Sequence, residues 1–424
     1  MDRRDFIKLC SLAGLGVVSL AAPGTVSRAR AASNRLWVFV HASGGWDPTL
    51  LTDPKGNEMN SEGFVVNNTF APSEILTSGN VSYAPIGQNA AFFGDAKYRS
   101  IMTVLNGIDC ETNGHDTGTR NAWAGRLNNN TPAFGALLAA VTGEGLPMGF
   151  LTNGGYDYTD GVVAPTRLGN GGALESLLHP NRTNPNDENS QLFVTEPTLE
   201  RIRAARSERL DTLRTAQHLP LIENAMSLLY TSRLGMDDLK LMSAELTKVT
   251  DAFGDLGQGM TRQARIAVAA YKAGLTRAVN LTLGGFDTHG NHDNQHETRL
   301  GELLTGVMAL YDCAEALGCA NELFTVVGSD FGRTPSYNDG NGKDHWTVGS
   351  MLILSPEIPG DRVIGATDDT FRHKKLDLGS LEVGGADALK LGHVHKWLRK
   401  FAGIADHPIV RRYPISVKGE LDLG

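Results

Sequence analysis

The sequence predicts an α/β fold around a doubly wound, mainly parallel sheet, and three observations point to it. Short apolar runs with few charges recur along the 424-residue chain, as is typical of strands buried on both faces of a parallel sheet. Segments with helical periodicity lie between some of these runs, and this alternation favours the doubly wound arrangement. Hydrophobic residues make up 41% of the chain and charged residues 20%, which is ordinary for a globular protein with a large core.

Six apolar runs are predicted to form the strands of the sheet. The first, "RLWVFVHASGGWD", is a strand that runs into a glycine-rich turn. In chain order the six segments are 35–47, 100–109, 146–155, 276–287, 322–331 and 349–356.

Amphipathic helices are predicted to cover this sheet. Residues 261–275 and 296–318 carry apolar side chains at helical spacing, and the second of these segments has a continuous leucine-rich stripe. Near the C-terminus, "LGHVHKWLRKF" is predicted to be a surface helix on which His393 and His395 are solvated.

The chain is predicted to contain a leader and one folded domain. Residues 32–424 are read as that domain, with a helical insertion at about 195–252. The stretch 168–192 is rich in glycine, asparagine and proline and is predicted to be mainly surface loop.

Residues 1–31 have the features of an export signal. A charged start is followed by an apolar stretch from Leu9 to Ala22 and by a small-residue cleavage site that ends at Ala31. "RRDFIK" looks like the twin-arginine export motif. The apolar stretch is short for a membrane-spanning helix, which needs roughly 20 residues. We therefore expect the twin-arginine machinery to export the protein to the periplasm or outside the cell, with no stable membrane insertion after cleavage.

The charge of the chain argues against nucleic acid as a partner. The formal net charge is −8 at pH 7, and removal of the basic leader makes the remainder more negative. Phosphate backbones and anionic lipid surfaces attract proteins with the opposite charge.

Polar side chains follow four of the predicted strands. In an open α/β sheet, ligands bind at the carboxyl ends of the strands, so these side chains are expected to converge. Carboxylate oxygens and imidazole nitrogens suit zinc, manganese or similar divalent ions. By strand, the residues are Asp47 after the first; Asp109, His115, Asp116, Thr117, Thr119 and Arg120 after the second; Asp287, His289 and His292 after the fourth; and Asp330, Arg333, Asp344 and His345 after the fifth.

Several motifs, taken in order, resemble a known family. The twin-arginine start, "GGWD", "GGFDTHGNH", "SDFGRTP" and "KDHW" look like the exported proteins catalogued as domain of unknown function 1501. That family is similar in turn to the alkaline phosphatase and sulfatase superfamily. The resemblance implies an alkaline-phosphatase-like α/β/α sandwich with a metal cluster at the strand ends.

The resemblance also implies a set of metal ligands. The cation is expected to be zinc, with manganese or calcium as alternatives. His289 is preferred over His292 as the histidine that follows Asp287, with His292 in reserve. The implied ligands are Asp47, Asp287, His289, His292, Asp330 and His345, and four of them (Asp47, Asp287, Asp330 and His345) are predicted to form one cluster.

One position departs from the superfamily pattern. Phe331 stands in "SDF" where a histidine usually follows the aspartate, so a second metal would lose a ligand unless His115, His41 or His292 substitutes.

The resemblance implies catalytic residues after the second strand. Thr117 and Thr119 are the candidate nucleophiles, and Thr117 is preferred, either to attack the ester or to orient an attacking water. Arg120 is expected to bind an anionic ester oxygen, since a guanidinium offers a planar fork of donors, or to pair structurally with Asp116.

The sequence favours two functions and leaves other chemistry at the same site, such as phosphomutase or transferase activity, as a remainder. The first is an exported metal-dependent hydrolase of a phosphate, sulfate or related anionic ester. The second is a non-catalytic exported protein on the same fold that binds a glycan or a protein partner and keeps a structural or vestigial metal site.

Overall fold

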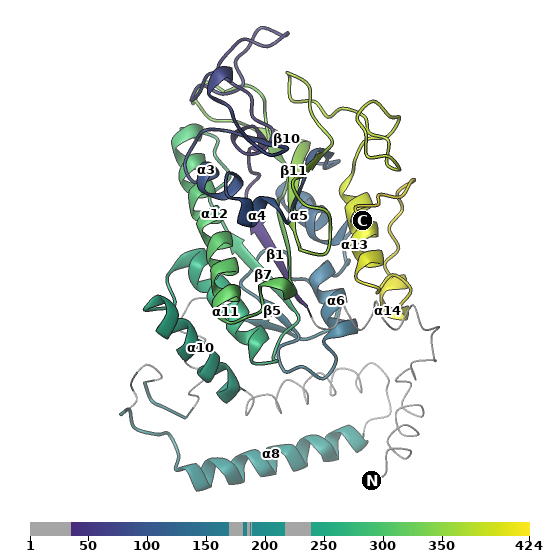
Figure 1. Ribbon diagram of the computed structural model, residues 1–424. Helices are drawn as coiled ribbons and strands as arrows, with labels where there is room; N and C mark the ends of the chain where they lie inside the picture. The colour runs from purple at the N-terminus through teal and green to yellow at the C-terminus, as the bar shows by residue number, and fades with distance from the viewer. Residues whose placement is uncertain (1–34, 169–180, 185–186, 188, 217–238) are drawn as a thin grey trace.

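The computed structural model describes residues 35–168, 181–184, 187, 189–216 and 239–424 (Figure 1). The predicted leader lies outside the described residues, as do parts of the predicted loop at 168–192 and of the predicted insertion.

The centre of the fold is an eight-stranded sheet in the order β12-β4-β11-β8-β1-β7-β5-β6. Every neighbouring pair is parallel except the two pairs that β11 makes, with β4 and with β8. The strands are β1 (Leu36–Ala42), β4 (Met102–Asp109), β5 (Phe150–Thr152), β6 (Pro165–Arg167), β7 (Ala278–Leu283), β8 (Leu323–Ser329), β11 (Val348–Leu354) and β12 (Arg362–Ile364). All six predicted strands are confirmed, and the sixth runs against the others.

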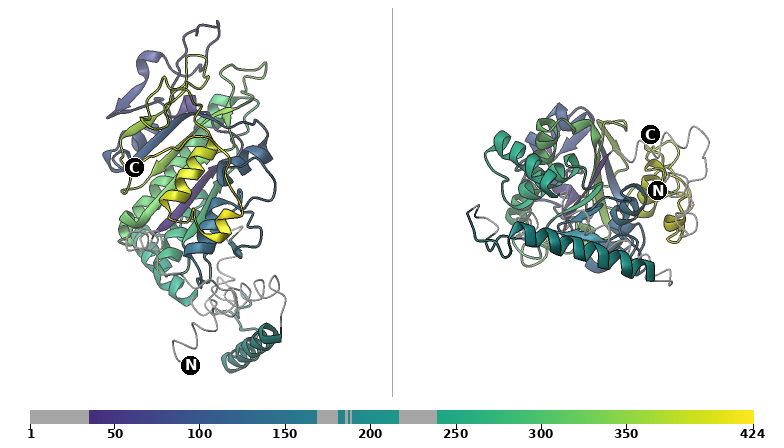
Figure 2. Two further views of the ribbon diagram at one scale, coloured as in Figure 1. Left: turned by 90° about the vertical axis from the view of Figure 1, so that its right-hand side faces the viewer. Right: turned by 90° about the horizontal axis from the view of Figure 1, so that it is seen from below.

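Helices cover both faces of the sheet, which confirms the predicted α/β/α sandwich (Figures 1 and 2). Side chains along a strand alternate between faces. In β1, Val38 and Val40 join a core shared with α11 (Gly259–Lys272) and α12 (His292–Ala316). Trp37 and Phe39 join a second core shared with α5 (His115–Ala124), α6 (Phe134–Thr142) and α13 (Leu391–Phe401). A strand buried on both sides needs the unbroken apolar run that the sequence shows.

Three helices match segments predicted from the sequence, α11 at 261–275, α12 at 296–318 and α13 at 391–401. On one face lie α10 (Leu239–Phe253), α11 (Gly259–Lys272) and α12 (His292–Ala316). On the other lie α5 (His115–Ala124), α6 (Phe134–Thr142), α13 (Leu391–Phe401) and α14 (Pro408–Arg411). The short helices α3 (Asn89–Phe93) and α4 (Ala96–Arg99) come directly before β4 in the chain.

Two helices lie in the described parts of the predicted insertion. Met242, Leu246 and Val249 of α10 are buried in the core shared with α11 and α12. The other helix, α8 (Glu196–Ala216), is drawn apart from the sandwich in Figures 1 and 2. None of the side chains described in α8 is buried. The two helices therefore differ in their relation to the core.

Two small hairpins complete the described strands. One joins β2 (Leu76–Ser78) and β3 (Val81–Tyr83), and the other joins β9 (Gly332–Arg333) and β10 (His345–Trp346). In the second hairpin His345 pairs with Arg333, which holds the "KDHW" segment beside the end of β8. No described helix is long and apolar enough to cross a membrane.

Candidate metal centre

Two glycine-rich turns pack against each other where β1 and β7 end. Gly44 has a φ of +121°, and a Cβ placed there would lie 2.5 Å from the backbone nitrogen of Asp287. Only glycine allows both this backbone conformation and this close approach. The motifs "GGWD" and "GGFD" thus bring the Asp287 segment against the end of β1.

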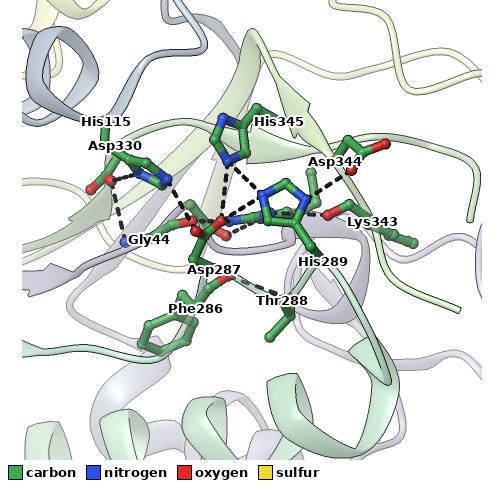
Figure 3. Close-up of polar contacts among 12 residues, drawn as sticks. Gly44, His115, Phe286, Asp287, Thr288, His289, Asp330, Lys343, Asp344 and His345 are labelled. Carbon is green, nitrogen blue, oxygen red and sulfur yellow. Dashed lines mark hydrogen bonds and ion pairs between the residues drawn. The ribbon is translucent and has the colours of Figure 1, made fainter. Parts of the chain in front are cut away.

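Three imidazoles surround the carboxylate of Asp287 at this edge of the sheet (Figure 3). The Nε2 atoms of His289 and His345 lie 3.0 and 3.1 Å from Asp287 Oδ1, and 3.0 Å from each other. His115 Nε2 lies 3.4 Å from Asp287 Oδ2. One ligand atom from each of His115, Asp287 and His345 lies within 4.8 Å of the other two.

The opposite nitrogen of each imidazole faces an acceptor. Nδ1 of His345 lies 2.8 Å from the carbonyl oxygen of Asn113. Nδ1 of His289 lies 2.8 Å from Asp344 Oδ1, and Nδ1 of His115 lies 2.8 Å from Asp330 Oδ2. Carbonyl and carboxylate oxygens only accept hydrogen bonds, so each Nδ1 carries the proton.

A neutral imidazole with its proton on Nδ1 has a lone pair on Nε2. The lone pairs of His289 and His345 therefore face each other and the carboxylate of Asp287, an arrangement that a cation between them would stabilise. Bonds of about 2.0 to 2.1 Å to zinc place tetrahedral ligand atoms roughly 3.3 Å apart, close to the separations found here. Metal-bound histidines characteristically donate their other N–H to a carboxylate or carbonyl, as all three do. The donor set fits a divalent metal.

Arg333 fixes the position of the Asp287 carboxylate. Its guanidinium is fully buried and donates to Asp287 Oδ1 at 2.7 Å and to the carbonyl oxygens of Gly44 and Gly45. Burial raises the pKa of Asp287, but the hydrogen bond and positive charge of Arg333 are the main opposing contributions, and the pKa stays at about 2. The carboxylate is therefore ionised and oriented at neutral pH.

Phe331 forms the floor of the cluster. Its ring is 1% exposed and lies 5.0 Å from the His115 ring and 4.7 Å from the His345 ring, centroid to centroid. The residue that departs from the superfamily pattern thus packs beneath two of the histidines.

Asp330 contacts the cluster through His115. Both of its oxygens have partners, with Oδ1 3.0 Å from His41 Nε2 and Oδ2 accepting from the Gly44 N–H and from His115. Burial raises the pKa of Asp330, but the hydrogen bonds from His115 and His41 hold it well below the usual range. Its carboxylate supports a histidine of the cluster and has no described contact with Asp287.

Asp47 and His292 lie in a separate buried network. Asp47 Oδ2 lies 2.6 Å from Lys343 Nζ and 3.1 Å from His292 Nε2, and Oδ1 accepts from the backbone and the hydroxyl of Thr49. The ammonium also donates to Asn67 Oδ1 at 2.8 Å. The side chains of Asp47, Lys343 and His292 are all fully buried. The structure therefore satisfies both oxygens of Asp47 within the protein and does not bring Asp47 or His292 to the cluster.

The two residues implied as catalytic lie off the cluster. His115 and Gly118 share the face of α5 that packs on residues 330–331, since a Cβ on Gly118 would meet the Asp330 carbonyl oxygen at 2.7 Å. Thr117 is two positions from His115, and residues two apart do not share a helix face. Arg120 donates to the Leu127 carbonyl oxygen at 2.6 Å.

The sequence reading named His115 only as a possible substitute ligand. One signal could have promoted it: it is the first residue of a helix that follows a buried strand, and Gly114 precedes it as the N-cap. The supporting acceptors Asn113 and Asp344 carry no comparable signal, because carbonyls are not visible in a sequence and single aspartates are common in loops.

Comparison with known proteins identifies a family. A family model described as "Protein of unknown function (DUF1501)" matches residues 34–377, which is most of the chain. A search of curated proteins finds no match.

Distant likenesses appear among solved structures. Ps i-CgsB in complex with k-i-k-neocarrahexaose shares 9% identity over 90% of this chain and 74% of that chain, with a TM-score of 0.33. Ps i-CgsB alone shares 10% identity over 87% and 72%, with a TM-score of 0.34. BT33494S-sulf, from work on glycosaminoglycan metabolism by Bacteroides thetaiotaomicron, shares 9% identity over 92% and 75%, with a TM-score of 0.35. Likeness at this level says nothing about the activity of this chain.

Proposed function

We propose, from the premise that this chain belongs to the DUF1501 family, that it is an exported metal-dependent hydrolase of a phosphate, sulfate or related anionic ester. The observation that carries the proposal is the convergence of three imidazole Nε2 atoms on the carboxylate of Asp287. The other side of each imidazole is already fixed by an acceptor.

His115, Asp287, His289 and His345 would hold the metal. The side chains of Asp287 and His289 are 46% and 47% exposed, so the cluster is open to solvent on that side. A divalent metal bound there would polarise an ester oxygen and lower the pKa of a bound water. Zinc is our first choice because imidazole nitrogen and carboxylate oxygen are among its usual ligands, with manganese or calcium as alternatives.

The protein's own residues orient these groups for reaction. Arg333 aims the carboxylate of Asp287, and Phe331 excludes water from beneath two histidines. The first turn of α5 begins at His115, and the N–H groups of a helix N-terminus favour a negatively charged group. This favours an anionic ester over a neutral one. Water is the attacking group in our proposal, because Thr117 does not share the face of α5 that carries His115.

Export belongs to the same proposal. The twin-arginine pathway carries folded proteins, which suits a chain that acquires its metal before it reaches the periplasm or the exterior. A small anionic ester or an ester on an extracellular glycan would then be the substrate.

Metal content and hydrolysis, measured together, test the function. We expect the chain without its leader, purified without chelators, to hold about one zinc or manganese and to hydrolyse an aryl phosphate or an aryl sulfate. His345→Ala should lose both properties. His373→Ala is the matched control, since His373 is half-buried outside the cluster, and it should keep both. A wild-type chain that stays metal-free after reloading would refute the proposal.

A non-catalytic role is the second candidate. It is favoured by one observation: neither Thr117 nor Arg120 has a described contact with the cluster. Stoichiometric metal without hydrolysis of any ester tested, together with binding of an anionic glycan, would support this second candidate over the first.

A further inference from the structure

We propose that Phe371 is a positioning residue. Its ring and its carbonyl oxygen hold the hairpin of β9 and β10, and through this hairpin they hold His345 beside Asp287. The inference rests on the proposed function only for the metal that His345 would bind, since the position of His345 is a property of the metal-free chain.

Phe371 has a backbone conformation that its residue type rarely adopts. Its φ is +58°, in the left-handed region that favours glycine, and for a bulky side chain this is an outlier. Eight described residues other than glycine have a positive φ, and Phe371 alone among them is buried. Such a conformation persists only where the surrounding structure over-determines it, and residues of this kind gather at functional sites. Its contacts therefore indicate what the conformation supports.

A hydrogen-bonded turn enforces this conformation. The Phe371 N–H donates to the Asp368 carbonyl oxygen at 3.2 Å, and the Asp368 N–H donates to the Arg372 carbonyl oxygen at 2.9 Å. Thr367 and His373 pair on either side, so the segment is a hairpin loop that ends in a left-handed residue, a position normally taken by glycine. The turn alone would be satisfied by glycine, so the phenylalanine side chain needs a separate explanation.

The side chain and the carbonyl oxygen of Phe371 both meet the hairpin of β9 and β10. The ring is fully buried, and a Cβ added to Gly332 would lie 3.5 Å from its Cε1 atom. Gly332 pairs with Trp346 across the hairpin. The indole N–H of Trp346 donates to the Phe371 carbonyl oxygen at 3.0 Å. Phe371 therefore contacts both members of one cross-strand pair.

His345 is the other residue of β10, and it pairs with Arg333. Each strand of this hairpin has only two residues, and a two-stranded hairpin is marginally stable without packing from elsewhere. Consecutive side chains of a strand point to opposite faces, so Trp346 meets Phe371 while His345 faces Asp287 Oδ1 at 3.1 Å. Packing at Trp346 therefore fixes the strand from which His345 reaches the cluster.

Phe371→Gly separates the role of the turn from the role of the ring. Glycine adopts a positive φ without strain, so a role confined to the turn predicts that this variant keeps both the position of His345 and the zinc affinity. Our inference predicts the opposite, because the ring against Gly332 is lost. Phe371→Leu keeps an apolar side chain at this place and should retain more zinc affinity than Phe371→Gly.

Trp346→Phe tests the contact with the carbonyl oxygen. It removes the indole N–H and keeps an aromatic ring. Trp37→Phe is the matched control, since Trp37 is fully buried and its indole N–H has no hydrogen-bond partner among the described residues. Both substitutions replace an indole by a phenyl ring, but only Trp346→Phe removes a hydrogen bond.

The first experiment locates His345 in the metal-free protein by NMR, with protons kept on histidine and phenylalanine rings. The His345 ring lies 4.7 Å from the Phe331 ring and 4.5 Å from the His115 ring, centroid to centroid, so we expect nuclear Overhauser contacts to both in the wild type. These contacts should weaken in Phe371→Gly and in Trp346→Phe and persist in the control. A wild type without them would overturn the inference even if no variant folds, and so would variants that keep them at full strength.

Zinc titration gives the second readout. Substitution of residues that orient a metal ligand lowers metal affinity by about 10- to 100-fold, and we expect about 10-fold in Phe371→Gly and in Trp346→Phe, with no loss in Trp37→Phe. Wild-type zinc affinity in both test variants would overturn the inference. Ring contacts that change as expected in a chain that binds no zinc would uphold the inference and refute only the proposed function.

Discussion

The buried ion pair of Asp47 and Lys343 is predicted to stabilise the fold beside the metal cluster, and a single substitution tests this. We choose Lys343→Met, which keeps most of the side-chain volume and removes the charge. Both side chains are fully buried, and Nζ lies 2.6 Å from Asp47 Oδ2. Removing one partner of a buried ion pair costs about 3 to 5 kcal/mol, because the other charge is left without compensation. Thr49 and His292 still contact the carboxylate, so we expect the lower half of that range.

Denaturant unfolding measures this loss. Lys248→Met is the control, since Lys248 is 60% exposed and pairs with Glu245 on a helix surface, where an ion pair contributes about 0 to 1 kcal/mol. The double variant Asp47→Leu/Lys343→Met should recover much of the stability, because it removes both charges together. A Lys343→Met chain as stable as the control would refute the buried-pair reasoning.

The family resemblance implied that Asp47 is a metal ligand, and its ion pair with Lys343 predicts that it is not. We expect Asp47→Asn to lower stability and to keep its metal, because both oxygens of Asp47 are occupied within the protein. Loss of metal with unchanged stability would contradict this and restore Asp47 to the ligand set.

Three further predictions follow from single contacts. Burial lowers the pKa of His395 to about 4 from an ordinary value of 6.5, so between these pH values the unfolded chain binds a proton that the folded chain does not. The free energy of unfolding should therefore fall by about 3 kcal/mol as the pH falls from 7 to 4. His395→Gln can still donate to the Ala122 carbonyl oxygen, and it should flatten this part of a curve of unfolding free energy against pH. Gly44→Ala should displace Asp287 and lower zinc affinity at least about 10-fold, since changes to residues that orient a metal ligand have effects of this size. Gly63→Ala, at a positive φ of 82° with open space around it, should keep the affinity, and equal affinities of the two variants in a zinc titration would contradict the packing argument. Thr117→Val should hydrolyse esters within about 3-fold of the wild type, and a loss of 100-fold or more would identify Thr117 as the nucleophile after all.

The strands and the edge at which polar residues gather were predictable from the sequence. Apolar runs identify buried strands, and parallel strands bring their carboxyl ends to one edge. The placement of Asp287, His289 and His345 around one point follows from that rule. Asp330 was predicted to be a metal ligand at this edge, but it contacts His115 instead, because a sequence does not show which oxygen meets which donor.

The direction in which a polar side chain points was not predictable. Asp47 turns into the core because Lys343, almost three hundred positions later, supplies a buried ammonium. Lysine is rarely buried, so no local pattern predicts such a partner. His393 and His395 were predicted to be solvated and are 3% and 1% exposed, since α13 turns them toward α5 and the C-terminal segment. The sequence of a helix does not show that the C-terminal segment will pack over one of its faces.

The reversed direction of β11 affects how the site can change. The connection from β8 to β11 leaves the sheet and returns to it at the same edge, because the two strands are antiparallel. A parallel β11 would have required a crossover that carries the chain to the far edge and back. Residues 330–347 therefore stay beside the centre throughout and contain Asp330, Arg333, Lys343, Asp344 and His345. Because no α-helix lies in this connection, a change in its length would not re-route either layer of helices.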